Sequence, residues 1–408
     1  MATLLSVNNY YYRRGGAESV FLEHNNLLKE QGWQVVPFSM QHPQNFDSEW
    51  SGYFVSEIEY GKSCSVFEKL RKGIRSVYSF EARRKVERLI DAVNPDICHG
   101  HNIYHHISPA ILESLKRHDI PVVITLHDLK LACPAYSMLN STGVCERCKD
   151  GKTHHVVGHR CMKGSLALSC LIYAESILHK LLGSYADNVD CFVVPSRFYK
   201  SKMNEWGWDT GRFHHISNFI DPDSYVPDFD PGDGFVYFGR LCREKGLRTL
   251  VKAAAIAGVT VDLVGSGPEE ADLRAFVART NAKVRFLGYR AGESLHSVIR
   301  GARACVLASE WYENAPISIL ESYALGKPVI GARIGGIPEL IHDGGTGMTF
   351  RSGSAEDLAD VLLKFRNMSS EEIGVMGRRG RRLVELEYSR ENYLDNIKKL
   401  YSGLGVVA

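Results

Sequence analysis

The sequence predicts a two-domain α/β protein in which buried parallel strands alternate with helices in each half of the chain. Its 408 residues are enough for two domains of ordinary size, each with its own apolar core. Short apolar runs alternate with longer amphipathic segments, and this alternation restarts at Phe235 after a segment rich in Pro, Asp and Gly. We therefore expect a first domain at residues 1–220, a linker at 221–234 and a second domain at 235–385.

The composition is that of an ordinary globular protein. Apolar residues make up 44% and charged residues 24% of the sequence, which argues against disorder. A net charge of +2 gives no support for nucleic-acid binding. No apolar run is long enough for a transmembrane helix, and the first residues lack the basic-then-apolar order of a signal peptide. Ten cysteines without an export signal predict a reducing, cytoplasmic compartment.

The first strand and the first helix are joined by a turn that contains a glycine pair. We expect strands at Thr3–Val7 and 34–39 and a helix at about 17–31, with Gly15 and Gly16 just before that helix. Glycines at such a turn let the backbone approach a ligand closely, and the N-terminus of the helix attracts anions. The turn lacks the GxGxxG pattern of dinucleotide-binding proteins. The pair is therefore either part of a phosphate site or an ordinary tight turn.

Residues 68–91 form a basic amphipathic segment. Apolar residues are interleaved with Arg and Lys, and basic residues outnumber acidic ones, unlike in the whole chain. A helix of this kind lies on an anionic membrane surface or meets a pyrophosphate-bearing ligand. An ordinary amphipathic helix with a basic solvated face explains the same pattern, so both interpretations stay open.

Histidines gather at the ends of two expected strands. The strands lie at 96–98 and 121–126, and a parallel sheet would bring their carboxyl ends to the edge where such sheets bind ligands. The side chains that follow these strands are His99, His101, His127 and Asp128. Imidazoles are adaptable hydrogen-bonding groups near neutral pH, so the set is suited to lining a binding site. Any one of these histidines alone would more often be structural.

Four cysteines lie within one polar loop. They are Cys133, Cys145, Cys148 and Cys161, and the middle two form a Cys-x-x-Cys unit. Four thiolates suit a tetrahedral zinc in a structural role, because they leave no open position for a substrate. Two disulfides or four reduced thiols are the alternatives.

In the second domain, glycines and basic residues follow the expected strands. The strand Phe235–Phe238 is followed by Gly239 and Arg240, and then by Lys245. An arginine and a lysine five residues apart on such a loop are able to neutralise a diphosphate. Strands at 261–264 and 284–287 are followed by further candidate contacts, namely Gly265, Tyr289 and Arg290. Simple packing is the alternative role for the tyrosine.

The segment 309–340 carries two strand-to-helix turns. The first follows an apolar strand at 304–307, and Pro316 suits the first turn of a helix that ends at Gly326. A further strand at 329–332 leads to the second turn. Free N–H groups and the positive ends of the helix dipoles suit a phosphate at these turns. The residues at the first turn that would meet it are Asn314, Ala315, Pro316 and Ile317.

Two glutamates flank the start of this helix. Glu313 precedes it and Glu321 lies in its second turn, so the two carboxylates reach groups on opposite sides of a bound phosphate. Together with the Gly-Arg…Glu-Lys-Gly pattern at 239–246, this pair resembles the two-glutamate signature of retaining glycosyltransferases of family 4, the glycogen-synthase-like enzymes. The resemblance covers nearly the whole chain and is more specific in its C-terminal half.

This resemblance implies the GT-B fold, in which two Rossmann-like domains face each other across a deep cleft. Residues 1–220, with a cysteine-rich insertion at 133–161, would bind the acceptor, and residues 235–385 would bind the donor. A helix within 386–408 would pack back onto the first domain. The implied reaction moves a hexose from a UDP- or GDP-sugar to a hydroxyl of a glycan or lipid-linked acceptor, with retention, in surface polysaccharide or glycolipid assembly.

The resemblance also implies roles for the candidate residues of the second domain. Arg240 and Lys245 would stabilise the departing diphosphate, and no metal cofactor would be required for catalysis. Glu313 would orient the hexose without acting as a nucleophile, and Glu321 would contact the ribose hydroxyls. The loop that carries Tyr289 would seat the nucleobase.

In the first domain, the glycine pair would lie beside the donor diphosphate and His101 would contact the reacting sugar. The acceptor side would consist of His99, His127 and Asp128. Because many relatives modify lipid-linked sugars, the resemblance adds an expected peripheral contact with the inner face of the membrane through residues 68–91.

Two other functions use the same pocket. A GT-B nucleotide-sugar epimerase would form its product without an acceptor. A non-catalytic nucleotide-sugar-binding subunit would bind the donor without turnover, and the intact basic and acidic side chains at Arg240, Lys245, Glu313 and Glu321 count against it.

Overall fold

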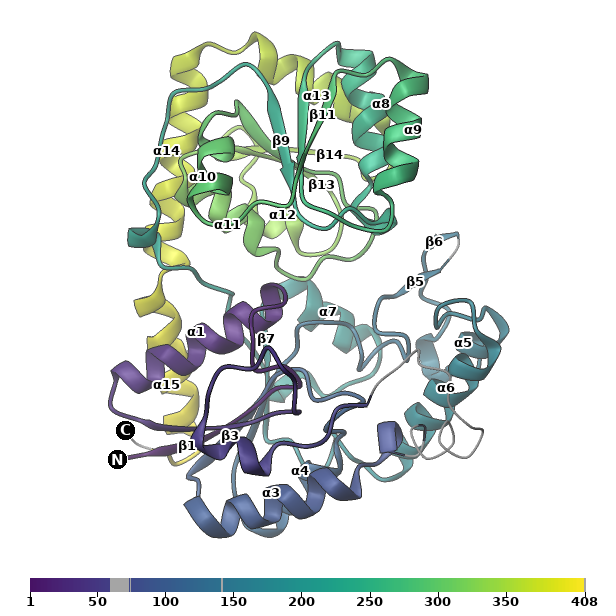
Figure 1. Ribbon diagram of the computed structural model, residues 1–408, viewed down its shortest axis with the longest axis vertical. Helices are drawn as coiled ribbons and strands as arrows, with labels where there is room; N and C mark the ends of the chain where they lie inside the picture. The colour runs from purple at the N-terminus through teal and green to yellow at the C-terminus, as the bar shows by residue number, and fades with distance from the viewer. Residues whose placement is uncertain (59–72, 74, 141, 407–408) are drawn as a thin grey trace.

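The computed structural model describes residues 1–58, 73, 75–140 and 142–406, which form two α/β domains one above the other in Figure 1. Each domain is built on a six-stranded parallel sheet with helices packed against it. This arrangement confirms the fold class predicted from the sequence. Within the described ranges, none of the helices has the length and apolar character needed to cross a membrane.

The sheet of the N-terminal domain has the strand order β2-β1-β3-β4-β7-β8. The strands are β1 (Thr3–Val7), β2 (Gln34–Phe38), β3 (Ile97–Gly100), β4 (Val122–Thr125), β7 (Cys191–Val194) and β8 (Phe213–His215). The helices of this domain are α1 (Gly16–Glu30), α3 (Phe80–Val93), α4 (Ala110–Arg117), α5 (His155–Gly158), α6 (Leu166–Leu181) and α7 (Arg197–Glu205). A short hairpin, β5 (Leu139–Asn140) with β6 (Gly143–Val144), lies in the cysteine-containing loop.

The sheet of the C-terminal domain has the order β11-β10-β9-β12-β13-β14. Its strands are β9 (Phe235–Phe238), β10 (Val261–Val264), β11 (Val284–Gly288), β12 (Ala304–Leu307), β13 (Val329–Ala332) and β14 (Gly347–Phe350). Its helices are α8 (Leu247–Ala257), α9 (Glu270–Thr280), α10 (Glu293–Arg300), α11 (Ile317–Ala324), α12 (Ile337–Leu340), α13 (Ala355–Asn367) and α14 (Ser370–Glu387).

The apolar runs identify the central strands because a parallel sheet is covered on both faces. Of the strands in the two large sheets, this pattern misses β8 and β14, which lie at one edge of each sheet. In β8, Phe213 is buried while His214 is exposed, and β14 begins with a glycine. Short edge strands with polar residues give no continuous apolar signal.

The single basic helix expected at 68–91 is wrong in its described part. Positions 68–72 and 74 lie outside the described residues, and the chain leaves the helical conformation at Tyr78 and Ser79. Helix α3 then begins anew, with the Ser79 side chain accepting a hydrogen bond from the Ala82 N–H. Two of the basic side chains, Arg75 and Lys85, also share one acidic partner, Glu81.

The segment 221–234 is held against the C-terminal domain. The Asp228 N–H donates to the Leu325 carbonyl at 3.0 Å, and Lys327 Nζ donates to the Asp230 carbonyl at 2.7 Å. The Phe229 ring packs where Gly326 and Gly377 leave room for it, since a Cβ on Gly326 would lie 2.9 Å from that ring. The composition predicts a linker here, and in the structure residues 228–230 of this segment are bound to the second domain.

The chain returns to the N-terminal domain through its last helix, α15 (Arg390–Gly403). Figure 1 shows this helix beside α1, next to the sheet that carries the N-terminus. Buried Tyr393, Ile397 and Tyr401 join one apolar cluster with Leu4 and Leu28. The chain passes between the domains twice, and the two passing segments meet where the Ile220 N–H donates to the Tyr388 carbonyl at 3.0 Å.

Candidate functional site

The two domains meet at the start of α11. The Asn314 amide donates to the Leu126 carbonyl at the end of β4, at 2.8 Å, and its oxygen accepts a hydrogen bond from Ser196 Oγ after β7, at 2.7 Å. Asn218 Nδ2 donates to the Ala315 carbonyl at 2.8 Å. The carboxyl end of the N-terminal sheet therefore faces the turn that the sequence predicts as a phosphate site. Ser196 was missed although it follows a strand at the same edge.

The glycine pair of the N-terminal domain also faces α11. Gly15 and Gly16 are exposed at the start of α1, and a Cβ on Gly16 would lie 3.4 Å from the Ile317 side chain. Two helix N-termini from different domains thus converge on one space. Free N–H groups at such termini attract an anion.

A charged pair forms the centre of the site on the C-terminal side. Lys245 Nζ lies 2.6 Å from Glu313 Oε1, and Ser309 Oγ donates to the same oxygen at 2.7 Å. Burial by itself would raise the pKa of Glu313, but the Lys245 ammonium and these hydrogen bonds outweigh it and hold the pKa below its ordinary value. Glu313 is therefore ionised, and its charge is matched by the lysine five residues after Arg240.

The strand ends on this side place backbone and exposed side chains around the pair. Gly239 and Arg240 are exposed after β9, and the Tyr237 hydroxyl donates to the Arg240 carbonyl at 2.8 Å. Gly265 has φ +135, and a Cβ there would overlap the Gly239 carbonyl. This close approach explains why glycine is needed after β10. Tyr289 is 77% exposed, so it does not pack in a core.

Arg290, the neighbour of that tyrosine, is also exposed at the end of β11. These two residues therefore lie at the surface of the C-terminal domain, one strand beyond Gly265 in the sheet order. The positions suit a flat ligand on this loop.

Glu321 differs from Glu313 in its electrostatic surroundings. Burial raises the pKa of Glu321 to about 7. Burial and, after it, the charge of Glu321 raise the pKa of Tyr225, so the two side chains are neighbours. A carboxyl group with this pKa gains from hydroxyl donors that hydrogen-bond to its ionised form.

The loop after β13 packs against the loop that carries Glu313 and Asn314. Gly335 and Gly336 follow β13, and Cβ atoms there would overlap the backbone of Glu313 and Asn314. The Gly336 N–H donates to the Glu313 carbonyl at 2.8 Å. These glycines therefore serve close loop packing, and they fix the backbone that carries Glu313.

On the N-terminal side, His101 and His127 form a stacked pair. Their ring centroids are 5.1 Å apart, and His101 Nδ1 shares a 2.8 Å hydrogen bond with His127 Nε2. Burial lowers the pKa of His127 to about 4 and that of His101 well below its ordinary value, so both rings are neutral at pH 7. His101 Nε2 is buried without a hydrogen-bond partner among the described residues.

Asp128 and Tyr136 extend this side toward the C-terminal domain. Burial raises the pKa of Asp128 to about 6, although the Lys130 N–H donates to it at 3.0 Å. Tyr136 is 38% exposed and has φ 54, a conformation that side chains other than glycine rarely adopt. Burial raises the pKa of its hydroxyl, the charge of Asp128 raises it as well, and the charge of Arg240 lowers it. The hydroxyl therefore lies near one charged residue of each domain. The sequence offered no signal for Tyr136.

His99 does not lie on the acceptor side, and this expectation is corrected. It belongs to β3 and is fully buried, with Nδ1 2.6 Å from the Tyr401 hydroxyl and Nε2 2.7 Å from Thr125 Oγ1. Tyr401 belongs to α15, which covers this part of the sheet. Both ring nitrogens are satisfied inside the core, so His99 supports the stacked His101 ring from below at 4.9 Å.

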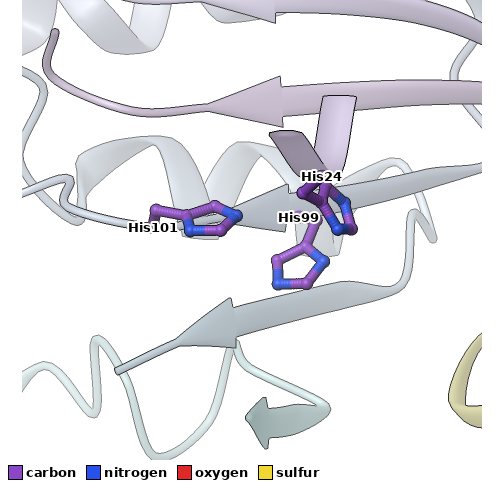
Figure 2. A group of neighbouring side chains, drawn as sticks. All are labelled: His24, His99 and His101. Carbon is purple, nitrogen blue, oxygen red and sulfur yellow. The ribbon is translucent and has the colours of Figure 1, made fainter. Parts of the chain in front are cut away.

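His24 joins these histidines from α1, as Figure 2 shows with His99 and His101. In the described part of the chain, this is the group of three ligand-type side chains whose ligand atoms lie within 4.8 Å of one another. The nitrogens of His24, however, lie 3.0 and 3.2 Å from the hydroxyls of Tyr393 and Tyr401. The group is a buried hydrogen-bond network that attaches α15, and it is not arranged as a metal centre.

The four cysteines of the insertion are free thiols. Burial and, after it, the neighbouring Cys133, Cys145 and Cys161 raise the pKa of Cys148 to about 12, so the four lie in one region. No three of their sulfurs fall within 4.8 Å of one another, since among the described residues only the histidines meet that spacing. Zinc binding would require the thiols to move together and lose their protons, so the zinc site stays a prediction.

Known proteins resemble this chain in sequence and structure. Residues 14–224 match the family described as Glycosyltransferase Family 4, and residues 232–367 match Glycosyl transferases group 1. N-acetyl-alpha-D-glucosaminyl L-malate synthase of Bacillus anthracis is 28% identical over 401 residues, which are 95% of this chain and 93% of that protein. The lipopolysaccharide core biosynthesis glycosyltransferase LpsE of Rhizobium meliloti (strain 1021) is 30% identical over 189 residues, 44% of this chain and 54% of that protein.

A solved structure has the same fold at low identity. Anabaena Alr3699/HepE in complex with UDP and glucose superposes with a TM-score of 0.70 and 16% identity, over 99% of this chain and 100% of that one. The match to the first family spans more than half of the present sequence.

Proposed function

The chain belongs to glycosyltransferase family 4 and has the GT-B fold, and from this premise we propose that it transfers a hexose from a UDP- or GDP-sugar to an acceptor hydroxyl with retention of configuration. The acceptor is a glycan or a lipid-linked sugar in polysaccharide or lipopolysaccharide assembly. LpsE, a lipopolysaccharide core enzyme, supports this choice of acceptor class.

The donor diphosphate lies over the N-terminus of α11. Arg240, which is exposed, and Lys245 supply positive charge from the loop after β9, and the N–H groups at the helix start supply partial charge. Breaking the bond between sugar and phosphate builds negative charge on the leaving diphosphate. These groups are preorganised for that charge, so they stabilise the transition state more than the bound donor.

The Lys245–Glu313 contact carries this proposal. A lysine bound to a buried carboxylate at 2.6 Å is held in one place at the mouth of the helix. The hexose lies beside Glu313, whose ionised oxygens accept hydrogen bonds from sugar hydroxyls and whose charge favours the positive sugar in the transition state. The lysine ammonium then lies between the carboxylate and the diphosphate.

The nucleoside lies on the opposite side of α11. Glu321 accepts hydrogen bonds from the ribose hydroxyls, which favours its ionised form and lowers its pKa from about 7. The base lies on the loop with Tyr289 and Arg290. The structure of HepE with UDP and glucose supports a uridine or related nucleotide at such a site.

The acceptor approaches from the N-terminal domain. His101 Nε2, buried and unpartnered among the described residues, donates to or accepts from the reacting sugar. His127 and Asp128 lie beside it, together with Tyr136. The acceptor oxygen forms the new bond as the sugar–phosphate bond breaks, and its proton passes to a phosphate oxygen of the donor, which leaves as the nucleoside diphosphate. The peripheral contact through residues 68–91 stays a prediction.

The experiment that tests the proposal measures release of nucleoside diphosphate from UDP- and GDP-sugars, with and without a lipopolysaccharide core acceptor. We expect release that depends on the acceptor and a glycoside with the anomeric configuration of the donor sugar. Product that forms equally well without any acceptor would show an epimerase or hydrolase instead.

A further inference from the structure

The loop between β12 and α11 directs successive side chains to opposite domains. Trp311 and Glu313 face the charged centre of the C-terminal domain, since Lys245 Nζ lies 5.5 Å from the Trp311 ring centroid and 2.6 Å from Glu313 Oε1. Tyr312 and Asn314 face the N-terminal domain, where Tyr312 packs against the apolar core and Asn314 binds the end of β4. The glutamate of the site is therefore flanked on both sides by residues that the other domain holds.

The hydrogen-bond partner of Tyr312 belongs to the cysteine-rich insertion at 133–161. The Tyr312 hydroxyl donates to Glu146 Oε1 at 2.6 Å, although the two residues are 166 positions apart in the sequence. Glu146 is the first of the two residues inside the Cys-x-x-Cys unit. A short hydrogen bond to a carboxylate is among the stronger hydrogen bonds in proteins. The insertion thus contacts the residue that directly precedes Glu313.

Helix α7 completes the surroundings of Tyr312. The ring centroids of Phe198 and Tyr312 are 4.9 Å apart, and Lys202 Nζ lies 5.3 Å from the Tyr312 centroid. The Lys202 side chain is 9% exposed and pairs with two carboxylates, Glu146 at 2.8 Å and Glu205 at 3.0 Å. Figure 1 shows α7 on the side of the N-terminal domain that faces the C-terminal domain. The tyrosine ring is therefore packed between the domains.

The two acidic partners of Lys202 differ in what else they bind. Glu205 belongs to α7 and pairs with Lys202 inside the N-terminal domain. Glu146 pairs with the same lysine and also binds Tyr312 of the C-terminal domain. If either carboxylate is removed, the lysine keeps the other one, so no buried charge is left uncompensated. Removal of Glu146 in addition breaks a contact between the domains.

We propose that Glu146 is a positioning residue, which holds Tyr312 and thereby fixes the backbone that carries Glu313. The contacts of Asn314 fix the same backbone from the other side, so the orientation of Glu313 depends on both domains. The cysteine-rich insertion lies outside the two six-stranded sheets, and this contact gives it a role in the candidate site. That this role serves sugar transfer rests on the proposed function.

The test compares kcat at saturating donor and acceptor for three variants. Glu146→Ala should lower kcat about ten- to a hundredfold, because displacement of Glu313 misorients the hexose. Glu146→Gln keeps an oxygen that accepts from the Tyr312 hydroxyl, so its kcat should stay within about threefold of the wild type. Glu205→Ala is the matched control, since it removes the other partner of Lys202 and should leave kcat within about twofold.

A double variant separates positioning from a general loss of packing. Tyr312→Phe removes the hydroxyl alone and should reproduce the fall in kcat of Glu146→Ala. The two substitutions together should lower kcat no further than either one does, because they break the same hydrogen bond. The affinity for UDP or GDP without a sugar should be unchanged in each variant, because the proposed nucleoside site lies on the other side of α11.

Hydrogen exchange of residues 309–316 reports on the same contact without any reaction. The Glu313 N–H donates to the Trp311 carbonyl at 2.9 Å. This amide should exchange about tenfold faster in Glu146→Ala and in Tyr312→Phe, since each variant frees the loop from one strong hydrogen bond. Its exchange in Glu205→Ala should equal that of the wild type. Thermal unfolding of each variant checks that the fold is intact.

Wild-type kcat in Glu146→Ala, an equal fall in kcat in Glu205→Ala, or additive losses in the double variant would overturn the proposal. Unchanged exchange at 309–316 would overturn it as well. If the wild type transfers no sugar from any donor, the proposed function fails, and the exchange measurement then decides whether Glu146 holds this loop.

Discussion

Replacing Lys245 by alanine removes the positive charge that lies against a buried carboxylate. In the wild type, the ammonium is 2.6 Å from Glu313, whose side chain is 9% exposed, while the lysine side chain is 24% exposed. After the substitution, the Glu313 oxygen that contacted the lysine still accepts the 2.7 Å hydrogen bond from Ser309 Oγ but no longer has a positive charge beside it. Two effects follow, one on turnover and one on stability.

The effect on turnover comes from the leaving diphosphate. Loss of one preorganised charged donor costs about 2–4 kcal/mol in the transition state, which corresponds to a fall in kcat of about 30- to 900-fold. The KM for the donor should change much less, because the charge on the diphosphate is larger in the transition state than in the bound donor.

The effect on stability comes from the unpaired carboxylate. Breaking a fully buried ion pair costs about 3–5 kcal/mol, and the partial exposure of Lys245 reduces the expected loss of unfolding free energy to about 1–3 kcal/mol. The lowered pKa of Glu313 stabilises the wild type above pH about 4.5, and this stability is lost as the pH falls through the lower, folded-state pKa. Without the lysine, burial raises that pKa above 4.5, so the stability lost in the variant should be largest near neutral pH and should shrink as the pH falls and Glu313 is protonated.

The assay measures kcat and KM for the donor, together with urea unfolding between pH 4 and 8, for the variant and a matched control. Lys252→Ala removes an exposed lysine from α8 in the same domain and should change neither quantity. A Lys245→Ala enzyme with wild-type kcat at saturating donor would refute the role of this lysine. A loss of unfolding free energy that is the same at pH 4 and pH 8 would refute the electrostatic account of Glu313.

Further predictions concern other parts of the site. Because burial raises the pKa of Glu321 to about 7 from 4.5, its contribution favours the folded state below pH 4.5 and is lost as the pH rises through 7. Glu321→Gln should therefore flatten the fall in thermal stability over that range while weakening nucleotide binding, and an unaltered slope would contradict this. Gly16→Val should press a branched side chain toward Ile317 and lower kcat at least about tenfold, with binding of the nucleotide alone nearly unchanged; loss of nucleotide affinity would place the glycine in the primary binding site. Elemental analysis of protein purified without added metal should find one zinc per chain, reduced by Cys145→Ser with Cys148→Ser, whereas ten titratable thiols without zinc would exclude the site.

The C-terminal half of the site was predictable because its motifs are local. Gly239, Arg240 and Lys245 follow a strand directly, and Glu313 precedes a helix whose proline and glycine limits are visible in the sequence. Close approach of strand-end loops then places these residues together. The apolar strands of both sheets were recognisable for the same reason, since each is buried on two faces.

The N-terminal half of the site depends on contacts between residues that are distant in the sequence. His99 and His101 lie two positions apart with similar neighbours, yet Tyr401, 302 positions away, binds one and not the other. Tyr136 comes to the site through a left-handed backbone conformation that no residue pattern announces. The segment 221–234 has the composition of a linker, but a backbone hydrogen bond to Leu325 and the packing of Phe229 fix it to one domain.

The most direct test of the central claim is calorimetric titration of the wild type and Glu321→Ala with UDP-, GDP- and dTDP-sugars. We predict that the wild type binds the nucleotide-sugars that carry one of these bases at a single site per chain. Glu321→Ala should weaken this binding at least about tenfold, since the carboxylate that hydrogen-bonds to the ribose is lost. Absence of binding by all of the nucleotide-sugars, or equal affinity in the variant, would contradict a donor site built on α11.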